Sequence, residues 1–425
     1  MGMWYRAVRS VASGALNVLL TREAFGLSHL PAEGGIIVAA NHGSFWDPPV
    51  LGIVIPRPLR YMTRASFFSV PLFGALIRSL GAFPVRKGTA DLSGLRAAEA
   101  ALARGDTDAA LAGFERAAGM LHAPDTEMGL VRTQMQAGQY RRALAFAAHT
   151  AGAHLEAPAA SALYAWLLQV GGQEAYARQV LDAAAKRSAG NEVLGATQRA
   201  FAATRVASGL LLERPHRMAP YPLPTPLASN ARAIASAVLL GDGRFALAPS
   251  AGLAAGRRLW VRNGIGRTSP AAVDRSFAES GLALLVLEQP LPGPAQFAQF
   301  AIAPRDPFAG SPGFVVDHAA SADAAPQWPL LHAGFFAAGV AGSNRPLGIE
   351  TSAGSAGAAV FDAGGRWAGI ALPGSRWVPL SQLRGLLGDM LPAALVGDAG
   401  ALSRIGADEV YERSLTVVLQ VLVEP

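Results

Sequence analysis

The chain has 425 residues, too many for one ordinary core, and domains of roughly 150 residues suggest two or three here. Apolar residues make up 51% and charged residues 16%, which excludes disorder through a lack of core-forming residues. Cysteine is absent, which excludes disulfide frameworks, thiolate zinc sites and cysteine nucleophiles, and no apolar run reaches the 18 or so residues of a spanning helix.

The positive charge lies mostly in residues 1–95, which hold nine Arg or Lys against four Asp or Glu. This basic segment is suited to anionic lipid head groups, phosphorylated substrates or nucleic acid, unless it reflects only a genomic bias towards arginine codons. Residues 4–20 predict an amphipathic helix that lies in a membrane interface or packs on its own domain. Residues 35–40 predict a strand. No secretion signal is evident, so we expect a cytoplasmic location, peripheral to the inner face of the membrane.

Residues 96–214 are alanine-rich and predict helices with a period of 33 or 34 residues. In each unit a glycine is followed five places later by an alanine, as in Gly105 with Ala110, Gly138 with Ala143, and Gly172 with Ala177. A glycine that ends one helix and an alanine that lets the next pack closely are typical of stacked helical pairs. The pattern resembles tetratricopeptide repeats, which implies a protein or peptide partner; a nonspecific helical bundle is the alternative.

Residues 215–228 are rich in proline and predict a linker. Short β-runs separated by turns follow, which predicts an all-β sandwich or barrel over residues 229–395. Residues 396–425 are treated as an extension, whose end reads as a helix turning into a strand. The predicted strands are Ala237–Leu240, Phe245–Ala248, Arg258–Val261, Leu282–Leu287, Phe314–Val316, Ala358–Phe361 and Trp367–Leu372.

One motif indicates chemistry. His42 and Asp47 stand five positions apart directly after the predicted strand, within the run Asn41-His42-Gly43-Ser44-Phe45-Trp46-Asp47-Pro48. If a turn brings them together, His42 can take a proton from an attacking hydroxyl while Asp47 orients the imidazole and stabilises its charged form. No covalent enzyme intermediate is needed, because an acyl thioester is already an activated donor. No cofactor and no metal are predicted.

The surroundings of this motif resemble the 1-acylglycerol-3-phosphate acyltransferases. Residues 34–49 look like the first signature block of that family, residues 60–78 follow its usual run, and residues 81–88 resemble its second block. The resemblance implies His42 and Asp47 as catalytic residues and acyl-CoA or acyl carrier protein as the donor. It implies that Asn41, Ser44, Gly81, Arg86 and Lys87 bind substrate. Lys87 replaces the family's arginine, which keeps the charge but loses the bidentate fork.

The third family block, a Phe-Pro-Glu-Gly-Thr-Arg run expected some 25 residues later, is missing, and so is the fourth. We therefore predict a truncated α/β acyltransferase-like segment over residues 1–95. The change near residue 90 falls inside what should be one domain, and a chimeric reading frame explains such a joint as well as a natural fusion does.

Residues 229–395 resemble the trypsin-like serine proteases, chiefly through residues 354–370. In that register Ala356 takes the nucleophile's place, Gly281 takes the place of the aspartate, and residues 248–253 contain no histidine. The resemblance therefore implies a trypsin-like barrel without proteolytic chemistry. Two functions follow from the whole chain: an acyltransferase that acts on lysophosphatidate at a membrane surface, or a non-enzymatic protein-binding scaffold. No nucleic-acid partner is expected.

Overall fold

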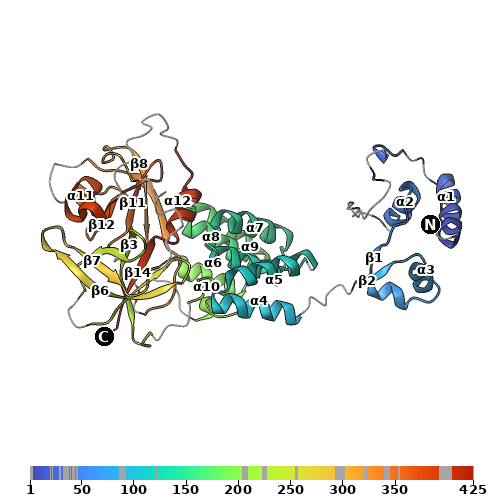
Figure 1. The fold of residues 1–425 in the computed structure, drawn as a ribbon, viewed down its shortest axis with the longest axis horizontal. Helices are drawn as coiled ribbons and strands as arrows, with labels where there is room; N and C mark the ends of the chain where they lie inside the picture. The colour runs from blue at the N-terminus through green and yellow to red at the C-terminus, as the bar shows by residue number, and fades with distance from the viewer. Residues whose placement is uncertain are drawn as a thin grey trace. The chain divides into compact units, whose positions relative to one another are not determined.

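The computed structural model describes most of the chain as two units, residues 1–90 and 91–425 (Figure 1). The described residues are 3–19, 21, 23–27, 30–31, 38, 40, 44, 46–85, 92–120, 122–202, 209–222, 227–253, 257–291, 302–319, 321, 323–338, 345–352, 355–391 and 404–424. The strand predicted at residues 35–40 lies largely outside them. Among the described residues, no helix is both long and apolar enough to cross a bilayer.

The first unit contains a small parallel sheet with helices. Strand β1 (Met62–Arg64) pairs in parallel with β2 (Phe83–Val85), and the chain between them forms the 3-10 helix η2 (Ala65–Ser69) and α3 (Phe73–Ser79). This β-helix-β connection fits the α/β class predicted for the segment. Two further helices precede it, α1 (Met3–Leu19) and α2 (Asp47–Val54).

Helix α1 packs on its own unit, one of the two alternatives left open by the sequence. The Arg9 guanidinium donates to the Ile53 carbonyl at 2.7 Å, and the Trp4 indole N–H donates to the Ser79 hydroxyl at 2.9 Å. Leu16 is buried, whereas Val11 and Val18 are 75% and 86% exposed. The helix therefore has an inner face that holds the unit together and an outer face with apolar side chains in solvent.

The second unit begins with helical hairpins (Figure 1). Each hairpin pairs two helices through a short turn, and one more helix follows the third hairpin. The helices are α4 (Leu92–Arg104), α5 (Thr107–Met120), α6 (Pro124–Gln136), α7 (Tyr140–Ala153), α8 (Pro158–Val170), α9 (Glu174–Arg187) and α10 (Glu192–Ala202).

The three hairpin turns are built alike, as the glycine–alanine period predicts. Gly105, Gly138 and Gly172 all have φ between +73° and +81°, a conformation that favours glycine. In every turn the residue after the glycine donates its N–H to the carbonyl five residues earlier, at 2.8–2.9 Å. The alanine five places after each glycine is fully buried. Small residues at these positions let successive helices approach closely, so the repeat is structural; membership of the tetratricopeptide family stays a prediction.

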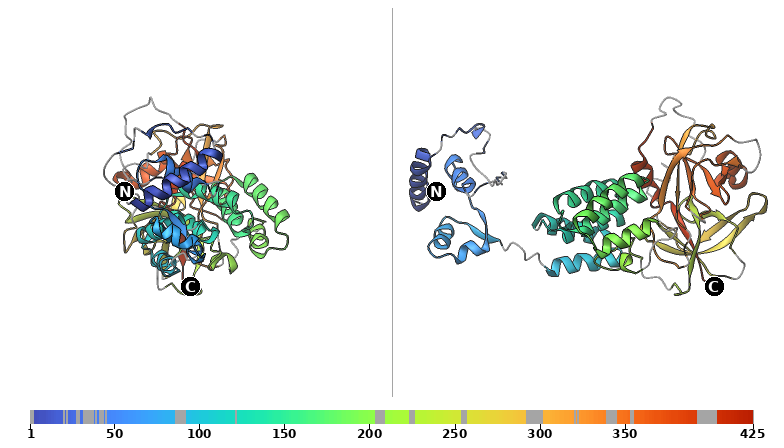
Figure 2. Two further views of the ribbon diagram at one scale, coloured as in Figure 1. Left: turned by 90° about the vertical axis from the view of Figure 1, so that its right-hand side faces the viewer. Right: turned by 180° about the vertical axis from the view of Figure 1, so that it is seen from behind.

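The remainder is antiparallel β-structure, in agreement with the all-β prediction (Figure 2). Strands β14-β3-β4-β7-β6-β5 form a closed barrel, and β10-β13-β12-β11-β8-β9 form a second sheet. Helix α11 (Leu380–Leu387), helix α12 (Ala407–Ser414) and the 3-10 helices η3 (Leu210–Leu212), η4 (Ala278–Ser280) and η6 (Gly388–Met390) complete the unit. The strands are β3 (Arg232–Leu240), β4 (Phe245–Pro249), β5 (Leu259–Asn263), β6 (Thr268–Phe277), β7 (Leu282–Leu287), β8 (Pro312–Asp317), β9 (Leu330–Phe335), β10 (Arg345–Pro346), β11 (Ala359–Asp362), β12 (Trp367–Leu372), β13 (Arg376–Pro379) and β14 (Val418–Val423).

The C-terminal segment belongs to the barrel, which corrects the predicted domain end at residue 395. Strand β14 pairs antiparallel with β3, from Val418 opposite Val238 to Val423 opposite Arg232, and on its other side with β5. All six of its residues are buried. The sequence predicts a helix followed by a strand here, and α12 and β14 confirm it. Its place in the barrel depends on pairing with residues far away in sequence, which local patterns do not reveal.

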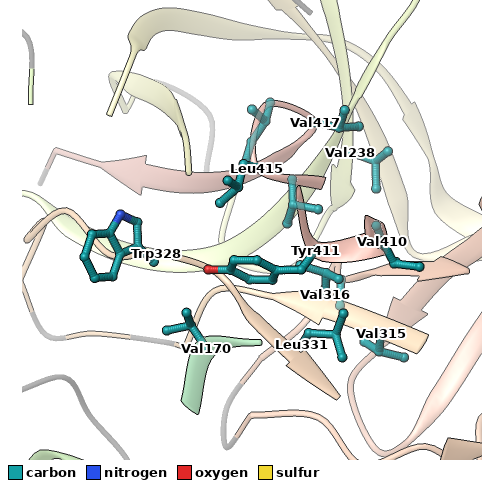
Figure 3. Packing of buried hydrophobic residues seen from close by; sticks show 14 of the residues in the cluster. Val170, Val238, Val315, Val316, Trp328, Leu331, Val410, Tyr411, Leu415 and Val417 are labelled. Carbon is teal, nitrogen blue, oxygen red and sulfur yellow. The ribbon is translucent and has the colours of Figure 1, made fainter. Parts of the chain in front are cut away.

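One apolar core joins the helices to both β-structures. Tyr411 of α12 is fully buried, and its ring lies edge-on to Tyr140 of α7 with centroids 4.4 Å apart. Its hydroxyl donates to the Pro329 carbonyl at 2.9 Å. Figure 3 shows this ring among Val170 of α8, Leu331 of β9 and other apolar side chains of the cluster. The helices and the β-structure therefore share a continuous interior.

The proline-rich segment is also packed, although the sequence predicts a free linker over residues 215–228. Its Arg217 carbonyl accepts from the buried Arg132 side chain at 2.8 Å. The Tyr221 backbone exchanges two hydrogen bonds with the Gln136 side chain, at 2.9 Å and 3.1 Å. Prolines stop the helix but leave carbonyls that are free to accept, and α6 uses them to satisfy its buried polar side chains.

His318 lies where the barrel meets the second sheet. Its backbone N–H donates to the Ser236 hydroxyl of β3 at 2.8 Å, and its ring Nε2 lies 3.4 Å from the Val418 carbonyl of β14. Burial lowers the pKa of His318 to about 4. The contact with the Val418 carbonyl and the charge of Asp317 raise this pKa, and Arg262 lowers it further, but burial dominates.

This buried imidazole predicts an acid-sensitive fold. The unfolded chain takes up a proton near pH 6.5 and the folded chain only near 4, so the contribution of His318 is complete above pH 6.5 and is lost as the pH falls towards 4. The full loss is about 3 kcal/mol. We expect urea unfolding of the wild-type chain to show this decline, and His318→Gln, which keeps a donor without titrating, to remove it. An unchanged slope in the variant would assign the decline to other groups.

Candidate functional site

The predicted acyltransferase site lies in the first unit and is partly described. Ser44, Asp47 and Gly81 lie within the described residues. Asn41, His42, Arg86 and Lys87 lie outside them, so the distance from His42 to Asp47 stays a prediction. The described residues nevertheless show how the chain shapes both ends of the site.

Asp47 lies at the end of a tight turn and begins α2. Its carboxylate accepts the Ser44 N–H at 2.8 Å, its own N–H donates to the Ser44 carbonyl at 3.1 Å, and the Trp46 N–H donates to the Ser44 hydroxyl at 3.2 Å. Pro48 and Pro49 follow, which suits the first turn of a helix, and a carboxylate is favoured at a helix N-terminus. The turn folds residues 44–47 back on themselves, as a His–Asp pair five positions apart requires.

A tyrosine fixes α2 against the β1 strand. The Tyr61 hydroxyl donates to the Pro48 carbonyl at 2.9 Å, next to Asp47. Burial raises the pKa of this hydroxyl, and Tyr5 adds to the effect, so Tyr61 stays a neutral donor. A Cβ on Gly52 would lie 2.7 Å from the Tyr61 oxygen, so the glycine leaves the space for this contact. The start of α2 is thereby held close to Tyr61, the residue that precedes β1.

The two strands end in register at one edge of the sheet. Arg64 ends β1 opposite Val85, which ends β2; Arg86 and Lys87 come next in the sequence and lie outside the described residues. Because the strands are parallel, their carboxyl ends share the edge where ligands of α/β folds bind. At the other end of β2, a Cβ on Gly81 would lie 3.5 Å from the Arg60 side chain. The pairing shows that Arg64 stands beside the second motif, which sequence spacing alone does not reveal.

In the β-structure, the three segments that resemble parts of a serine-protease triad in sequence lie close together. The Ser250 N–H, just after β4, donates to the Gly281 carbonyl at 2.9 Å, and a Cβ on Gly357 would lie 2.6 Å from Pro249. Ala356 precedes that glycine. The absence of proteolytic chemistry stays a prediction from the sequence.

A separate Ser–His–Asp cluster occurs in the second sheet, and the sequence gives no sign of it. Asp317 is fully buried and accepts the Ser352 N–H at 2.8 Å and the Ser352 hydroxyl at 2.7 Å. His332 Nε2 lies 3.2 Å from that hydroxyl and 3.4 Å from Asp317. Burial alone would raise the pKa of Asp317, but hydrogen bonds from His332 and Ser352 lower it.

This cluster is built for structure rather than nucleophilic attack. The same carboxylate holds the pKa of His332 above its usual value although burial acts in the opposite direction. The serine proton points to the carboxylate, and a single nitrogen of His332 faces both partners. In a triad, by contrast, the histidine takes the serine proton with one nitrogen and meets the aspartate with the other.

Comparison with known proteins finds a match in the N-terminal part of the chain. The family model "Acyltransferase" matches residues 22–111. The 1-acyl-sn-glycerol-3-phosphate acyltransferase of Bacillus subtilis (strain 168) is 28% identical over 78 residues, which cover 17% of this chain and 39% of that protein. The chain thus spans well under half the length of this curated relative. The family match also runs past residue 95, where the sequence analysis ends the resemblance, over α4 and into α5.

Two solved structures that the comparison matches to part of this chain are the MamO protease domain from Magnetospirillum magneticum and Deg5. They are 16% and 14% identical, each with a TM-score of 0.28. They cover 38% and 36% of this chain, and 92% and 83% of their own chains. The strand pairing itself defines the barrel and the second sheet here. The functional comparison therefore concerns the N-terminal part: residues 22–111, which include Ser44, Asp47 and Gly81, form an acyltransferase-like segment.

Proposed function

We propose that the chain transfers a fatty acyl group from an acyl thioester to the free hydroxyl of lysophosphatidate. The observation that carries this proposal is the Ser44–Asp47 turn at the start of α2, inside the segment that the acyltransferase family model matches. His42 is the base that removes the hydroxyl proton as the oxygen attacks the thioester carbonyl. Asp47 orients the imidazole and stabilises its charged form, and the thiolate of the donor leaves.

The acceptor phosphate is assigned to the second motif. Arg86 and Lys87 follow β2 directly in the sequence, and Val85, the last residue of β2, pairs with Arg64 of β1. Cationic side chains suit a phosphate monoester, and Lys87 acts as a point charge rather than a bidentate fork. Asn41 and Ser44 are part of the same proposal, and so is Gly81, which precedes β2 at its opposite end.

A membrane surface is the proposed source of this acceptor. Trp4, Val11 and Val18 of α1 are 56%, 75% and 86% exposed, and their spacing of seven residues places them along one face of the helix. An exposed apolar stripe on a helix with arginines is suited to an interface of anionic lipid. A peripheral position at the inner face of the membrane is part of the same proposal.

The test is acyl transfer by the purified full chain, with a labelled acyl thioester and lysophosphatidate in phospholipid vesicles. We expect His42→Ala to lower turnover by at least about a hundredfold, because a positioned base contributes 10²–10⁴. Asp47→Asn should lower kcat with little change in KM. His29→Ala, a histidine of the same matched segment outside the motif, is the control and should stay active. A folded chain without transfer, or transfer that survives His42→Ala, would refute the proposal.

The alternative is a non-enzymatic scaffold, favoured by one observation of its own. The hairpins α6–α9 share one interior with the β-structure, and the first hairpin, α4–α5, packs on α6 through a second apolar cluster. A rigid array of helical pairs presents an extended surface to a protein or peptide. Failure of the transfer assay with a well-folded chain would leave this function in place.

A further inference from the structure

The second helical hairpin gathers histidines that are far apart in sequence. His122 lies in the turn between α5 and α6, Glu127 in the first turns of α6, and His149 near the end of α7. One potential ligand atom from each lies within 4.8 Å of the other two. His154 follows the last residue of α7, and its ring is tilted by 55° to that of His122, with the centroids 4.9 Å apart.

The carboxylate of Glu127 is buried at the centre of this group. Its side chain is 2% exposed, and the rest of α6 from Thr126 to Gln136 is buried as well. One oxygen, Oε1, contacts Nδ1 of His122. The other, Oε2, is buried without a well-formed hydrogen bond, and so is Nε2 of His154, which lies 3.4 Å away. A buried carboxylate is costly unless a positive charge or donors satisfy it.

We propose that His122, His149 and Glu127 bind one divalent transition-metal ion, with zinc as the cognate ion. Two imidazoles and a carboxylate form a donor set that zinc prefers, and they leave a fourth position open to water or another ligand. Zinc ligands lie about 2.0–2.1 Å from the ion, so the three side chains need to close by small rotations. The exposed imidazole of His122 (61%) and the exposed His149 are free to make them.

His154 is a positioning residue for this site. Its Nε2 faces the oxygen of Glu127 that does not point to His122, and its Nδ1 lies 3.5 Å from Glu156. A histidine N–H that donates to a ligating carboxylate fixes the carboxylate's orientation. With zinc bound, Glu127 would use Oε1 for the metal and Oε2 for His154, so both orphaned buried atoms obtain partners.

The site would tie the start of α6 to the end of α7. Its role is independent of acyl transfer, because all of its ligands belong to the helical hairpins. The sequence alone predicts no metal, since the intervals between these residues match no zinc-binding pattern. Only the antiparallel packing of α6 and α7 brings them together.

The experiment is zinc titration of the full chain without a histidine tag, after dialysis against chelator, by calorimetry and by competition with a chromophoric indicator. We expect one Zn²⁺ per chain, a rise in melting temperature, and visible absorption typical of a tetrahedral site when Co²⁺ replaces zinc. Mg²⁺, which prefers oxygen ligands, should neither bind at the same concentration nor raise the melting temperature.

Matched variants separate ligands from bystanders. His149→Ala and His122→Ala should lower zinc affinity at least a hundredfold and abolish the Co²⁺ spectrum, and His154→Gln should lower affinity by about 10- to 100-fold. Asp125→Asn removes a charge from the same turn of α6 and should leave affinity unchanged. His149 is exposed, so circular dichroism and metal-free melting of His149→Ala should match the wild type, whereas His122→Ala also removes the partner of Glu127 Oε1 and should melt at a lower temperature. Absent or substoichiometric binding, or equal affinity in the ligand variants, would overturn the proposal and leave Glu127 as an ion-pair partner only.

Discussion

A chain that ends at Gly406, and so lacks α12 and β14, is expected to lose cooperative unfolding altogether. The barrel would open between β3 and β5, leaving two unpaired edges, and the pocket of Tyr411 would be empty. Each large buried side chain contributes about 1.5–3 kcal/mol. The free energy gained by burying the five apolar residues of β14 and Tyr411 is thus as large as the whole stability of a typical domain, about 5–15 kcal/mol.

Near-ultraviolet circular dichroism and thermal melting measure this loss. A chain that lacks only Pro425 keeps β14 and Glu424, which accepts from Trp260 at 3.0 Å, and should melt as the full chain does. A synthetic peptide of residues 405–425, added to the truncated chain, should restore part of the signal. If the truncated chain melted cooperatively at an unchanged temperature, β14 would be dispensable and the barrel would not depend on its closure.

Gly357→Ala is expected to lower the free energy of unfolding by about 3–4 kcal/mol, a large loss for a single substitution in the β-structure. The residue has φ +83°, and an added Cβ would lie 1.9 Å from the Ser236 carbonyl oxygen and 2.6 Å from Pro249. Both are backbone or ring atoms of paired strands and cannot rotate away. The Gly357 N–H also donates to the Ala371 carbonyl at 2.8 Å, so the loop cannot shift outward without losing that bond.

Gly310→Ala is the matched control because Gly310 also has a positive φ, +77°, but open space around the added carbon. It should cost only about 1 kcal/mol, the penalty of the left-handed conformation. Urea unfolding of both variants gives the difference. Equal losses would mean that backbone conformation, rather than the close approach of β3, dominates at Gly357.

The sequence predicts the strands that are buried on both faces better than those that are not. Residues 282–287 and 367–372 are continuous apolar runs, and the observed strands have the predicted bounds. Strand β6 escaped prediction because half of its residues are exposed and it carries Pro270, Asp274 and Arg275. Strand β13 has only four residues, and it ends in a proline. Tertiary pairing decides such segments, since local patterning is weak.

The candidate sites also differ in how far local sequence predicts them. The motif of His42 and Asp47 is local, so the chain itself reveals it, and the turn at Ser44 follows from short-range bonds. The cluster of Glu127 with its histidines and the network around Asp317 arise only when distant segments pack. The intervals between the residues of either cluster match no known sequence motif. These residues become neighbours only when the hairpin or the sheet has folded.

The shared interior of the second unit couples events at its two ends. Arg141 of α7 holds the Glu412 carboxylate of α12 through two hydrogen bonds, at 2.8 Å and 3.1 Å, beside the Tyr140–Tyr411 contact. Helices that melt with the barrel cannot be stabilised alone. A peptide or ion that binds only the folded hairpins therefore stabilises the sheets by the same free energy, although it does not contact them. Slower hydrogen exchange of the barrel amides would then report that the ligand is bound.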